Sequence, residues 1–208
     1  PLSPMTDDSL FAGLPIPADV LVTRQVLADP ARMGSEVKVW ARLKDGTPLV
    51  KVIEAAGTLP GIKVDKGVKP LPLCPGEVIT EGLDGLRERL IEYRALGAKF
   101  AKWRAVIDIG GDMPTFACVN ANAHALARYA ALCQQANIVP IVEPEVLMDG
   151  EHDIDTCYDV TEWALKETFN ELYKAEVALE GMVLKPNMAI AGKKSAKKAS
   201  VQEVAEKT

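Results

Sequence analysis

The sequence is poor in residues that hold metal ions or cross-link a chain. It contains only two histidines, His124 and His152, and four cysteines without any C-x-x-C pair. Two distant histidines cannot supply a three-ligand zinc site without help from carboxylates, so we expect no metal ion, and we expect no other cofactor. We interpret both histidines as surface or core-edge residues and the cysteines as reduced core thiols of a cytoplasmic protein.

Long apolar runs and a surplus of positive charge are also missing. No stretch approaches the ~18 uninterrupted apolar residues of a membrane span. The net charge of −5 argues against a general nucleic-acid binder. No secretory signal follows Pro1, and the absence of an initiator Met indicates that the true start lies elsewhere. We therefore expect a cytoplasmic protein with neither a membrane nor a nucleic acid as its partner.

The pattern of the chain changes after its first quarter. With 208 residues, the chain is long enough for one domain with a sizeable core. Residues 1–42 contain five prolines, and only 19–29 shows a helical spacing of apolar residues. From residue 57 onward, short β-rich runs alternate with long helical stretches, which is typical of parallel βα units. We therefore divide the chain into an unmatched N-terminal segment, 1–42, and an α/β domain, 43–208.

The alternating region predicts both strands and helices. The expected strands are 59–65, 99–107, 138–143 and 179–185. The expected helices are 83–96, 115–135, 155–177 and a last one that begins at Ser200, which has a capping-box spacing with Glu203. This order of elements indicates an α/β fold with a parallel sheet.

Ionisable residues gather near the carboxyl ends of these strands. Seven residues form the set: Lys63, Asp65, Lys102, Arg104, Glu143, Glu145 and Lys185. The first member on each strand recurs at intervals of 39, 41 and 42 residues, close to one βα unit. On the first three strands a second member stands two positions later and therefore faces the same side of its strand, and Lys185 is single. The interval is a little longer than the ~31 residues per unit of an eight-unit βα barrel. Because helices cover the outer face of such a barrel, we expect all seven groups to meet at its mouth, where these folds build active sites.

Taken singly, each charged pair could also be a pair of solvated residues at the end of a strand. Ionisable residues at the ends of all four strands, however, favour a functional site. Four basic and three acidic groups suit an anionic substrate that also needs proton transfer. Lys185 ends an apolar strand, where desolvation and a cation such as Lys102 would favour its neutral amine, a nucleophile towards carbonyls. Without these neighbours, Lys185 would be interpreted as a lysine that snorkels to solvent.

Five segments, in this order, resemble the consecutive motifs of class I fructose-bisphosphate aldolases. They are GIKVDKG at 61–67, GLDGL at 82–86, FAKWR at 100–104, IVPIVEPE at 138–145 and LKPNM at 184–188. The resemblance extends from about residue 42 to residue 208. It implies a TIM-type (β/α)8 barrel, usually a homotetramer, that acts on a phosphorylated sugar in glycolysis and gluconeogenesis without a metal ion.

The resemblance also implies a lyase reaction and its catalytic residues. Lys185 resembles the lysine that forms a Schiff base with the ketone of fructose 1,6-bisphosphate. Glu143 matches the glutamate that moves protons during imine formation, Glu145 matches its neighbouring carboxylate, and Lys102 matches the lysine that orients the reacting centre. Cleavage of the C3–C4 bond would then release glyceraldehyde 3-phosphate and, after protonation of the enamine, dihydroxyacetone phosphate.

The resemblance implies that Lys63 and Arg104 bind the phosphate-bearing end of the substrate, and we place Asp65 with them. The family's first strand, with an aspartate in an Ala-Asp-Glu-Ser context, has no counterpart in 1–42, and its last two strands would lie beyond Thr208. We therefore expect an incomplete barrel. Three functions stay open: a fructose-bisphosphate aldolase, a Schiff-base aldolase for another phosphorylated ketose, and an inactive truncated fragment that binds a partner or completes a barrel with another polypeptide.

Overall fold

Four parallel strands form the sheet that carries the expected site. The structure, a computed structural model, describes residues 44–208, so the segment 1–42 and its expected helix at 19–29 lie outside the described residues. The strands stand in the order β1-β4-β5-β6. Their bounds are β1 (Gly61–Lys63), β4 (Phe100–Ile107), β5 (Val139–Val146) and β6 (Val183–Leu184).

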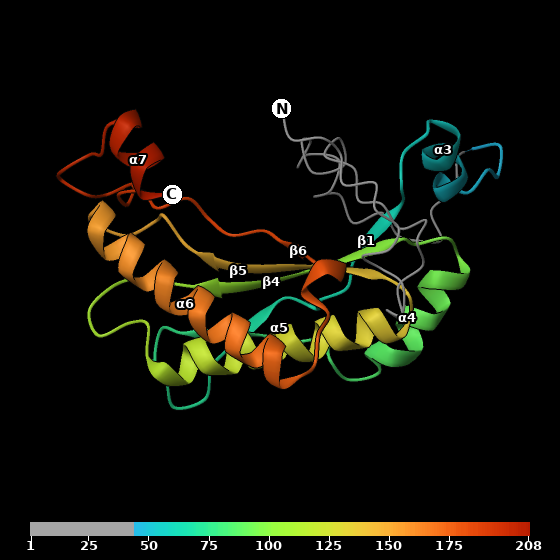
Figure 1. Ribbon diagram of the computed structural model, residues 1–208, viewed down its shortest axis with the longest axis horizontal. Helices are drawn as coiled ribbons and strands as arrows, with labels where there is room; N and C mark the ends of the chain where they lie inside the picture. The colour runs from blue at the N-terminus through green and yellow to red at the C-terminus, as the bar shows by residue number, and fades with distance from the viewer. Residues whose placement is uncertain (1–43) are drawn as a thin grey trace.

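Three helices cover one face of this sheet, as Figure 1 shows. They are α4 (Leu86–Ala95), α5 (Phe116–Gln135) and α6 (Ile154–Lys174). The last helix, α7 (Val201–Lys207), lies apart from these three. It begins after Ser200, whose side chain forms the expected capping box with Glu203. All four lie close to their predicted positions, and the predicted α/β fold with a parallel sheet is confirmed.

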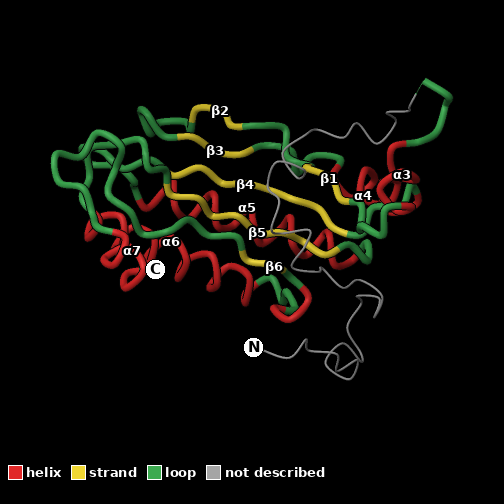
Figure 2. The backbone as a smooth tube through the Cα atoms, turned by 90° about the horizontal axis from the view of Figure 1, so that it is seen from above, coloured by secondary structure: helices red, strands yellow, loops and turns green. Residues whose placement is uncertain are grey.

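Within residues 44–208, one short α-helix and one hairpin were not predicted. Helix α3 (Leu49–Ala55) precedes β1, and β2 (Val68–Pro70) pairs in antiparallel fashion with β3 (Val78–Thr80). Figure 2 shows the hairpin beside the second half of β4, beyond the end of β1. The Thr80 hydroxyl donates to the Arg104 carbonyl at 2.7 Å, which fastens the hairpin there. Strands of three residues among prolines give too short an alternation to be recognised.

The fourth strand was predicted too long and the third too short. Most of the expected strand 179–185 is wrong, because η2 (Leu179–Gly181) is a 3-10 helix and only Val183–Leu184 pairs as β6. The expected strand 59–65 shortens to Gly61–Lys63. Conversely, β5 continues through Pro144 to Val146. The nitrogen atoms of its prolines face β6 and not β4, so the missing N–H groups do not interrupt the pairing of β5 with β4.

The core between sheet and helices is built around Trp103 of β4. Trp103 faces the helices, as alternation with Lys102 and Arg104 predicts, and it is fully buried. Its ring stacks on Tyr129 of α5 with centroids 5.5 Å apart. The same cluster includes Leu86, Leu90, Leu126 and Leu172 from all three covering helices. Trp103 therefore fixes the orientation of β4, whose opposite face carries the ionisable residues.

Replacing Trp103 with Ala is expected to lower the free energy of unfolding by about 3–5 kcal/mol, since it removes the largest buried ring and leaves a cavity. Urea unfolding followed by circular dichroism measures the change. Tyr173→Ala is the matched control, because that ring is 83% exposed, and it should change stability by less than about 0.5 kcal/mol. Equal losses for the two variants would contradict the burial of Trp103 in the core.

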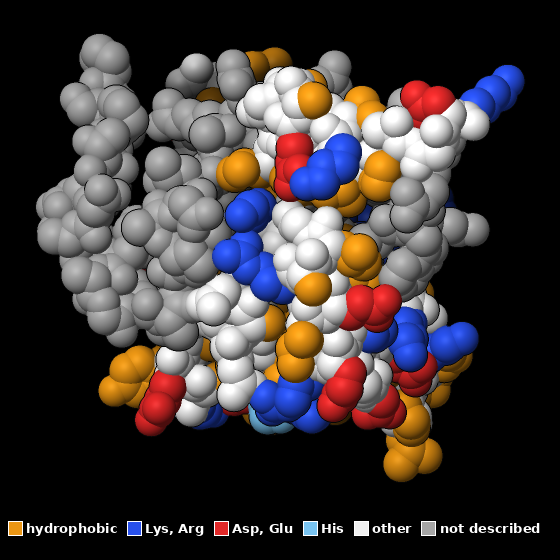
Figure 3. All heavy atoms as spheres, turned by 90° about the vertical axis from the view of Figure 1, so that its right-hand side faces the viewer, with side chains coloured by type: hydrophobic (Ala, Val, Ile, Leu, Met, Phe, Trp, Pro, Cys, Tyr) orange, Lys and Arg blue, Asp and Glu red, His pale blue; other side chains and the backbone are white. Residues whose placement is uncertain are grey.

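The face around α3 and α4 carries charges of both signs (Figure 3). Lys51 of α3 pairs with Glu54 at 2.7 Å. Among the described side chains visible on this face, basic and acidic groups are interspersed without a large area of one sign. Within residues 44–208, no helix has both the length and the apolar character needed to cross a membrane.

Candidate active site

The sheet register places the ionisable residues in layers on the face opposite the helices. Lys63 of β1 is the register partner of Lys102 of β4, which is in turn opposite Ile141 of β5. Ile141 pairs with Val183 of β6. Two residues further along, on the same face, the next layer holds Arg104, Glu143 and Lys185.

Glu143 is the centre of the site. Its side chain is only 2% exposed, and its two oxygens contact two lysines from the neighbouring strands. Lys102 lies 2.8 Å from Oε2 as an ion pair, and Lys185 donates a hydrogen bond to Oε1. Buried carboxylates need such partners because burial without them is costly. The carboxyl group is therefore held between two amines, one from each adjacent strand.

Two further ion pairs flank this centre. Arg104 Nη1 lies 3.1 Å from Glu145 Oε2, and Lys63 Nζ lies 2.6 Å from Asp65 Oδ1. The side chains of Arg104 and Lys63 are 42% and 32% exposed, whereas that of Lys102 is 18% exposed. The two more exposed cations can therefore reach a ligand from solvent more readily than Lys102.

The carboxylate of Asp65 accepts hydrogen bonds from the backbone that follows it as well as from Lys63. Its side chain is 3% exposed, and Oδ1 accepts from the Gly67 amide at 3.0 Å as well as from Lys63. Asp65 is therefore less accessible than Lys63 and orients the Lys63 amine. Its own carboxylate is too buried to contact a ligand directly. The structure thus brings together all seven residues that the sequence singles out. They form four ion pairs, two of which share Glu143, on four neighbouring strands and directly after them.

Arg89 of α4 supports this edge of the site and was missed in the sequence. Its guanidinium donates to the carbonyls of Val64 and Gly82, at 3.0 and 2.5 Å. Val64 lies between Lys63 and Asp65, so the contact fixes the strand exit that carries both. An arginine on a helix rich in charged residues gives no signal in the sequence that separates it from a solvated one.

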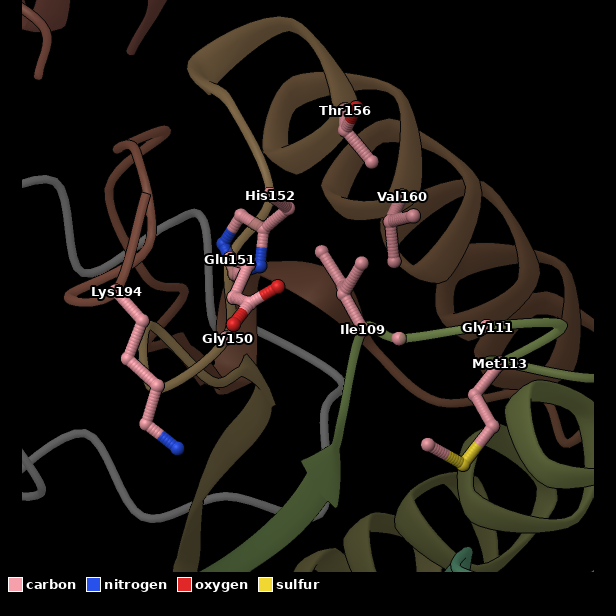
Figure 4. A pocket seen from close by; sticks show the side chains of 10 residues that line it. Ile109, Gly111, Met113, Gly150, Glu151, His152, Thr156, Val160 and Lys194 are labelled. Atoms are coloured by element: carbon pink, nitrogen blue, oxygen red, sulfur yellow. The ribbon is translucent and has the colours of Figure 1, made fainter. Parts of the chain in front are cut away.

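A cavity of about 530 Å³ lies apart from the charged cluster. Figure 4 shows its walls, which come from the loops that follow β4 and β5, the start of α6, and Lys194. None of the seven predicted site residues lines it. His152 does, and it is buried with both ring nitrogens lacking a hydrogen-bond partner. His124, by contrast, sits on the surface of α5 and contacts Glu171 at 2.8 Å.

His152 is expected to make the stability of the fold depend on pH in mild acid. Burial lowers the pKa of His152 from its usual 6.5, and the charges of Asp153 and Asp108 only partly oppose this. The unfolded chain therefore binds a proton more readily than the folded chain, so stability is full above about pH 7 and falls as the pH drops through and below 6.5.

The expected result is a free energy of unfolding that decreases between pH 7.5 and 5.5 by at most about 1.4 kcal/mol per pH unit. Urea titrations at several pH values measure it. His152→Gln cannot take up this proton, and it should flatten the dependence in this range. The same slope in wild type and His152→Gln would refute the assignment to His152.

The four cysteines are free thiols in the structure. Three of them, Cys118, Cys133 and Cys157, are buried. Desolvation by burial, assisted by the charge of Glu77, raises the pKa of Cys118 to about 12, and burial also raises the pKa of Cys133 well above its usual range. Neither forms a reactive thiolate near neutral pH. Among residues 44–208, no three His, Cys, Asp or Glu side chains cluster as metal ligands.

Comparison with known proteins supplies the family. The family model for class I fructose-bisphosphate aldolases matches residues 34–208. The chain belongs to the class I fructose-bisphosphate aldolase family. The chain is 61% identical over 167 residues to a Xanthomonas campestris protein named "probable fructose-bisphosphate aldolase class 1", which covers 80% of the chain and 50% of that protein.

Two eukaryotic family members extend the comparison. The chain is 50% identical over 162 residues to cytosolic fructose-bisphosphate aldolase 6 of Arabidopsis thaliana, covering 78% of the chain and 45% of that aldolase. The solved fructose-bisphosphate aldolase from Plasmodium falciparum, in complex with TRAP and a small-molecule inhibitor, superimposes with a TM-score of 0.80 at 44% identity. That match covers 82% of this chain and 50% of the other. The chain thus spans about half the length of the curated aldolases it matches, and its sheet is part of a TIM-type barrel.

Proposed function

We propose that this chain carries the Schiff-base centre of a class I fructose-bisphosphate aldolase, a lyase that reversibly cleaves fructose 1,6-bisphosphate. The observation that carries the proposal is the contact of the Lys185 amine with the buried carboxyl group of Glu143, which Lys102 holds from the other side. Family membership supports it. Nothing observed among residues 44–208 specifically favours a non-catalytic fragment.

The Lys185–Glu143 pair can exchange one proton along its hydrogen bond. Transfer from the ammonium to the carboxylate leaves a neutral amine beside a carboxylic acid. The amine can then add to the substrate's C2 ketone, and the acid can protonate the carbinolamine hydroxyl, which leaves as water. The product is an iminium, and the Glu143 carboxylate that remains offsets its charge.

The iminium then acts as an electron sink. A carboxylate of the cluster removes the proton of the C4 hydroxyl, the C3–C4 bond breaks, and its electron pair forms an enamine with the iminium carbon. Glyceraldehyde 3-phosphate leaves. Protonation of the enamine at C3 and hydrolysis of the imine release dihydroxyacetone phosphate and restore the Lys185 amine.

The flanking cations suit the phosphate-bearing end of the substrate. Lys63 and Arg104 are the most exposed cations of β1 and β4 in the cluster, and a phosphate could displace their present carboxylate partners, Asp65 and Glu145. We assign substrate binding to Lys63 and Arg104, with Asp65 orienting the Lys63 amine, and orientation of the reacting centre to Lys102. By the same family argument, we propose a cytoplasmic protein that assembles as a homotetramer.

Reductive trapping tests the proposal. The chain is incubated with dihydroxyacetone phosphate, reduced with borohydride, digested and analysed by mass spectrometry. The expected result is an adduct on the peptide that contains Lys185. The absence of an adduct, or an adduct confined to a peptide with another lysine, would remove the mechanism. Comparing cleavage of fructose 1,6-bisphosphate with that of fructose 1-phosphate then decides which ketose the site prefers.

A further inference from the structure

The strand that carries Lys185 is weakly held by backbone pairing. Only Val183 and Leu184 pair with β5, and the Lys185 amide adds one bond to the Val142 carbonyl at 2.9 Å. Within the described residues, no later backbone hydrogen bond joins β5 to 186–191. A ladder this short does not fix the position of the residue at its end.

The sequence of β5 explains why the ladder stops. Successive N–H groups of a parallel strand point alternately to its two neighbours. The amides of Val139 and Leu147 donate to carbonyls of the β4 segment, so the amide positions of even-numbered residues in this stretch face β6. One of these is Pro144, which has no N–H to donate. The next, Val146, has passed the end of β6.

Asn187 takes the place of the missing strand partner. Its side-chain Oδ1 accepts from the Val146 amide at 3.0 Å. Its Nδ2 donates to the Thr161 hydroxyl of α6 at 2.9 Å and to the Met188 carbonyl at 3.1 Å. Thr161 is only 9% exposed. One amide group thus ties the exit of β6 to the end of β5 and to the covering helix.

The position of this tether relative to the reacting pair gives it a function. Asn187 stands two residues after Lys185, and Val146 stands three residues after Glu143. Glu143 is also fixed by Lys102, whereas the Lys185 side chain is 39% exposed and, among residues 44–208, is held by the Glu143 contact alone. Release of the tether would therefore displace the amine and leave the carboxyl group in place.

We propose that Asn187 is a positioning residue that holds the Lys185 amine against Glu143 for imine formation. This inference rests on the proposed Schiff-base function. Asn187 touches neither the substrate-binding cations nor the carboxyl group, so its loss changes the rate of imine formation and not the affinity for the phosphorylated ketone. A misplacement of about 1 Å is enough to slow such a reaction by roughly 10²-fold.

The test measures the initial rate of reductive trapping at increasing dihydroxyacetone phosphate for wild type, Asn187→Ala, Asn187→Asp and Thr161→Val. Asn187→Ala should lower the maximal rate at least tenfold and leave the half-saturating concentration within twofold. Asn187→Asp keeps an acceptor for the Val146 amide and should remain within about threefold of wild type. Thr161→Val removes one partner of Asn187 and should lower the rate by about twofold to fivefold.

Hydrogen exchange gives the second readout. The Val146 amide should exchange at least tenfold faster in Asn187→Ala than in wild type, while the circular dichroism spectrum stays unchanged. Wild-type trapping rates in Asn187→Ala, together with fast Val146 exchange, would overturn the inference alone. Absence of an adduct in wild type would instead overturn the proposed function, and the inference with it. If Asn187→Ala does not fold, equal rates for wild type and Thr161→Val, with Asn187→Asp slowed as much as tenfold, would also overturn the inference.

Discussion

Substituting Arg for Lys185 is expected to abolish the trapped adduct, with a loss of at least roughly 10³-fold in trapping rate. A guanidinium retains the positive charge that pairs with Glu143, so the ion pair and the fold should persist. It cannot lose its proton under these conditions and therefore cannot add to a carbonyl. The substitution thus separates the chemical role of the amine from its electrostatic role.

Lys51→Arg is the matched control for this substitution. Lys51 lies on α3, its side chain is 68% exposed, and it pairs with Glu54 outside the site. The variant should form the Lys185 adduct at the wild-type rate. The urea midpoints of both variants should equal that of wild type within error. An undiminished adduct in Lys185→Arg, on any other lysine, would show that the nucleophile had been assigned to the wrong residue.

The long elements could be predicted because their sequence pattern is decided locally. Helices α5 and α6 have apolar faces over 20 and 21 residues, and each begins at a side-chain cap, Thr115 and Asp153. Strand β4 alternates between ionisable residues and buried ones such as Trp103. Elements with such periodicity form whenever the rest of the fold covers their apolar face, so their positions can be predicted without knowing the partner.

The elements that were missed depend on distant partners. The β2–β3 hairpin is fastened by Glu77, which accepts from the Thr115 amide at 2.7 Å across 38 residues of chain. The true length of β6 depends on the side chain of Asn187 and on Pro144 in another strand. No window of local sequence contains both partners, so periodicity alone assigns 179–185 to one strand.

The candidate site illustrates both cases. The shared face of the seven residues follows from the period of two along each strand and from the parallel order of the strands. The specific partners do not follow, because Lys102 contacts the residue two positions beyond its register partner Ile141. This offset, which Arg104 repeats with Glu145, results from the reach of long side chains along the sheet.

The residues that only support the site, Arg89 and Asn187, gave no signal in the sequence. Asn187 lies inside the LKPNM segment, but asparagine is a common residue in turns and loops and does not by itself indicate a role in a site. Its role depends on a hydrogen bond to an amide 41 residues earlier in the chain. Roles of this kind become visible only when the backbone partners are placed.

Changing Glu143 to Gln is expected to slow trapping by about 10²–10⁴-fold, the usual contribution of a positioned acid–base group. The amide has nearly the shape of the carboxyl group and can still contact Lys102 and Lys185, so the site should keep its packing. It can neither accept the proton of the Lys185 ammonium nor donate one to the carbinolamine hydroxyl. Both proton transfers of imine formation are lost together.

Glu145→Gln controls for the loss of a negative charge on the same strand and face. The Glu145 side chain is 27% exposed and pairs with Arg104 and not with a lysine. Because it does not contact the Lys185 amine, its substitution should slow trapping by no more than about tenfold. The half-saturating concentration of dihydroxyacetone phosphate should change more in Glu145→Gln than in Glu143→Gln, because Arg104 belongs to the phosphate-binding side. Trapping in Glu143→Gln as fast as in Glu145→Gln would mean that another group moves these protons. The buried carboxyl group of Glu143 would then serve only to bridge Lys102 and Lys185.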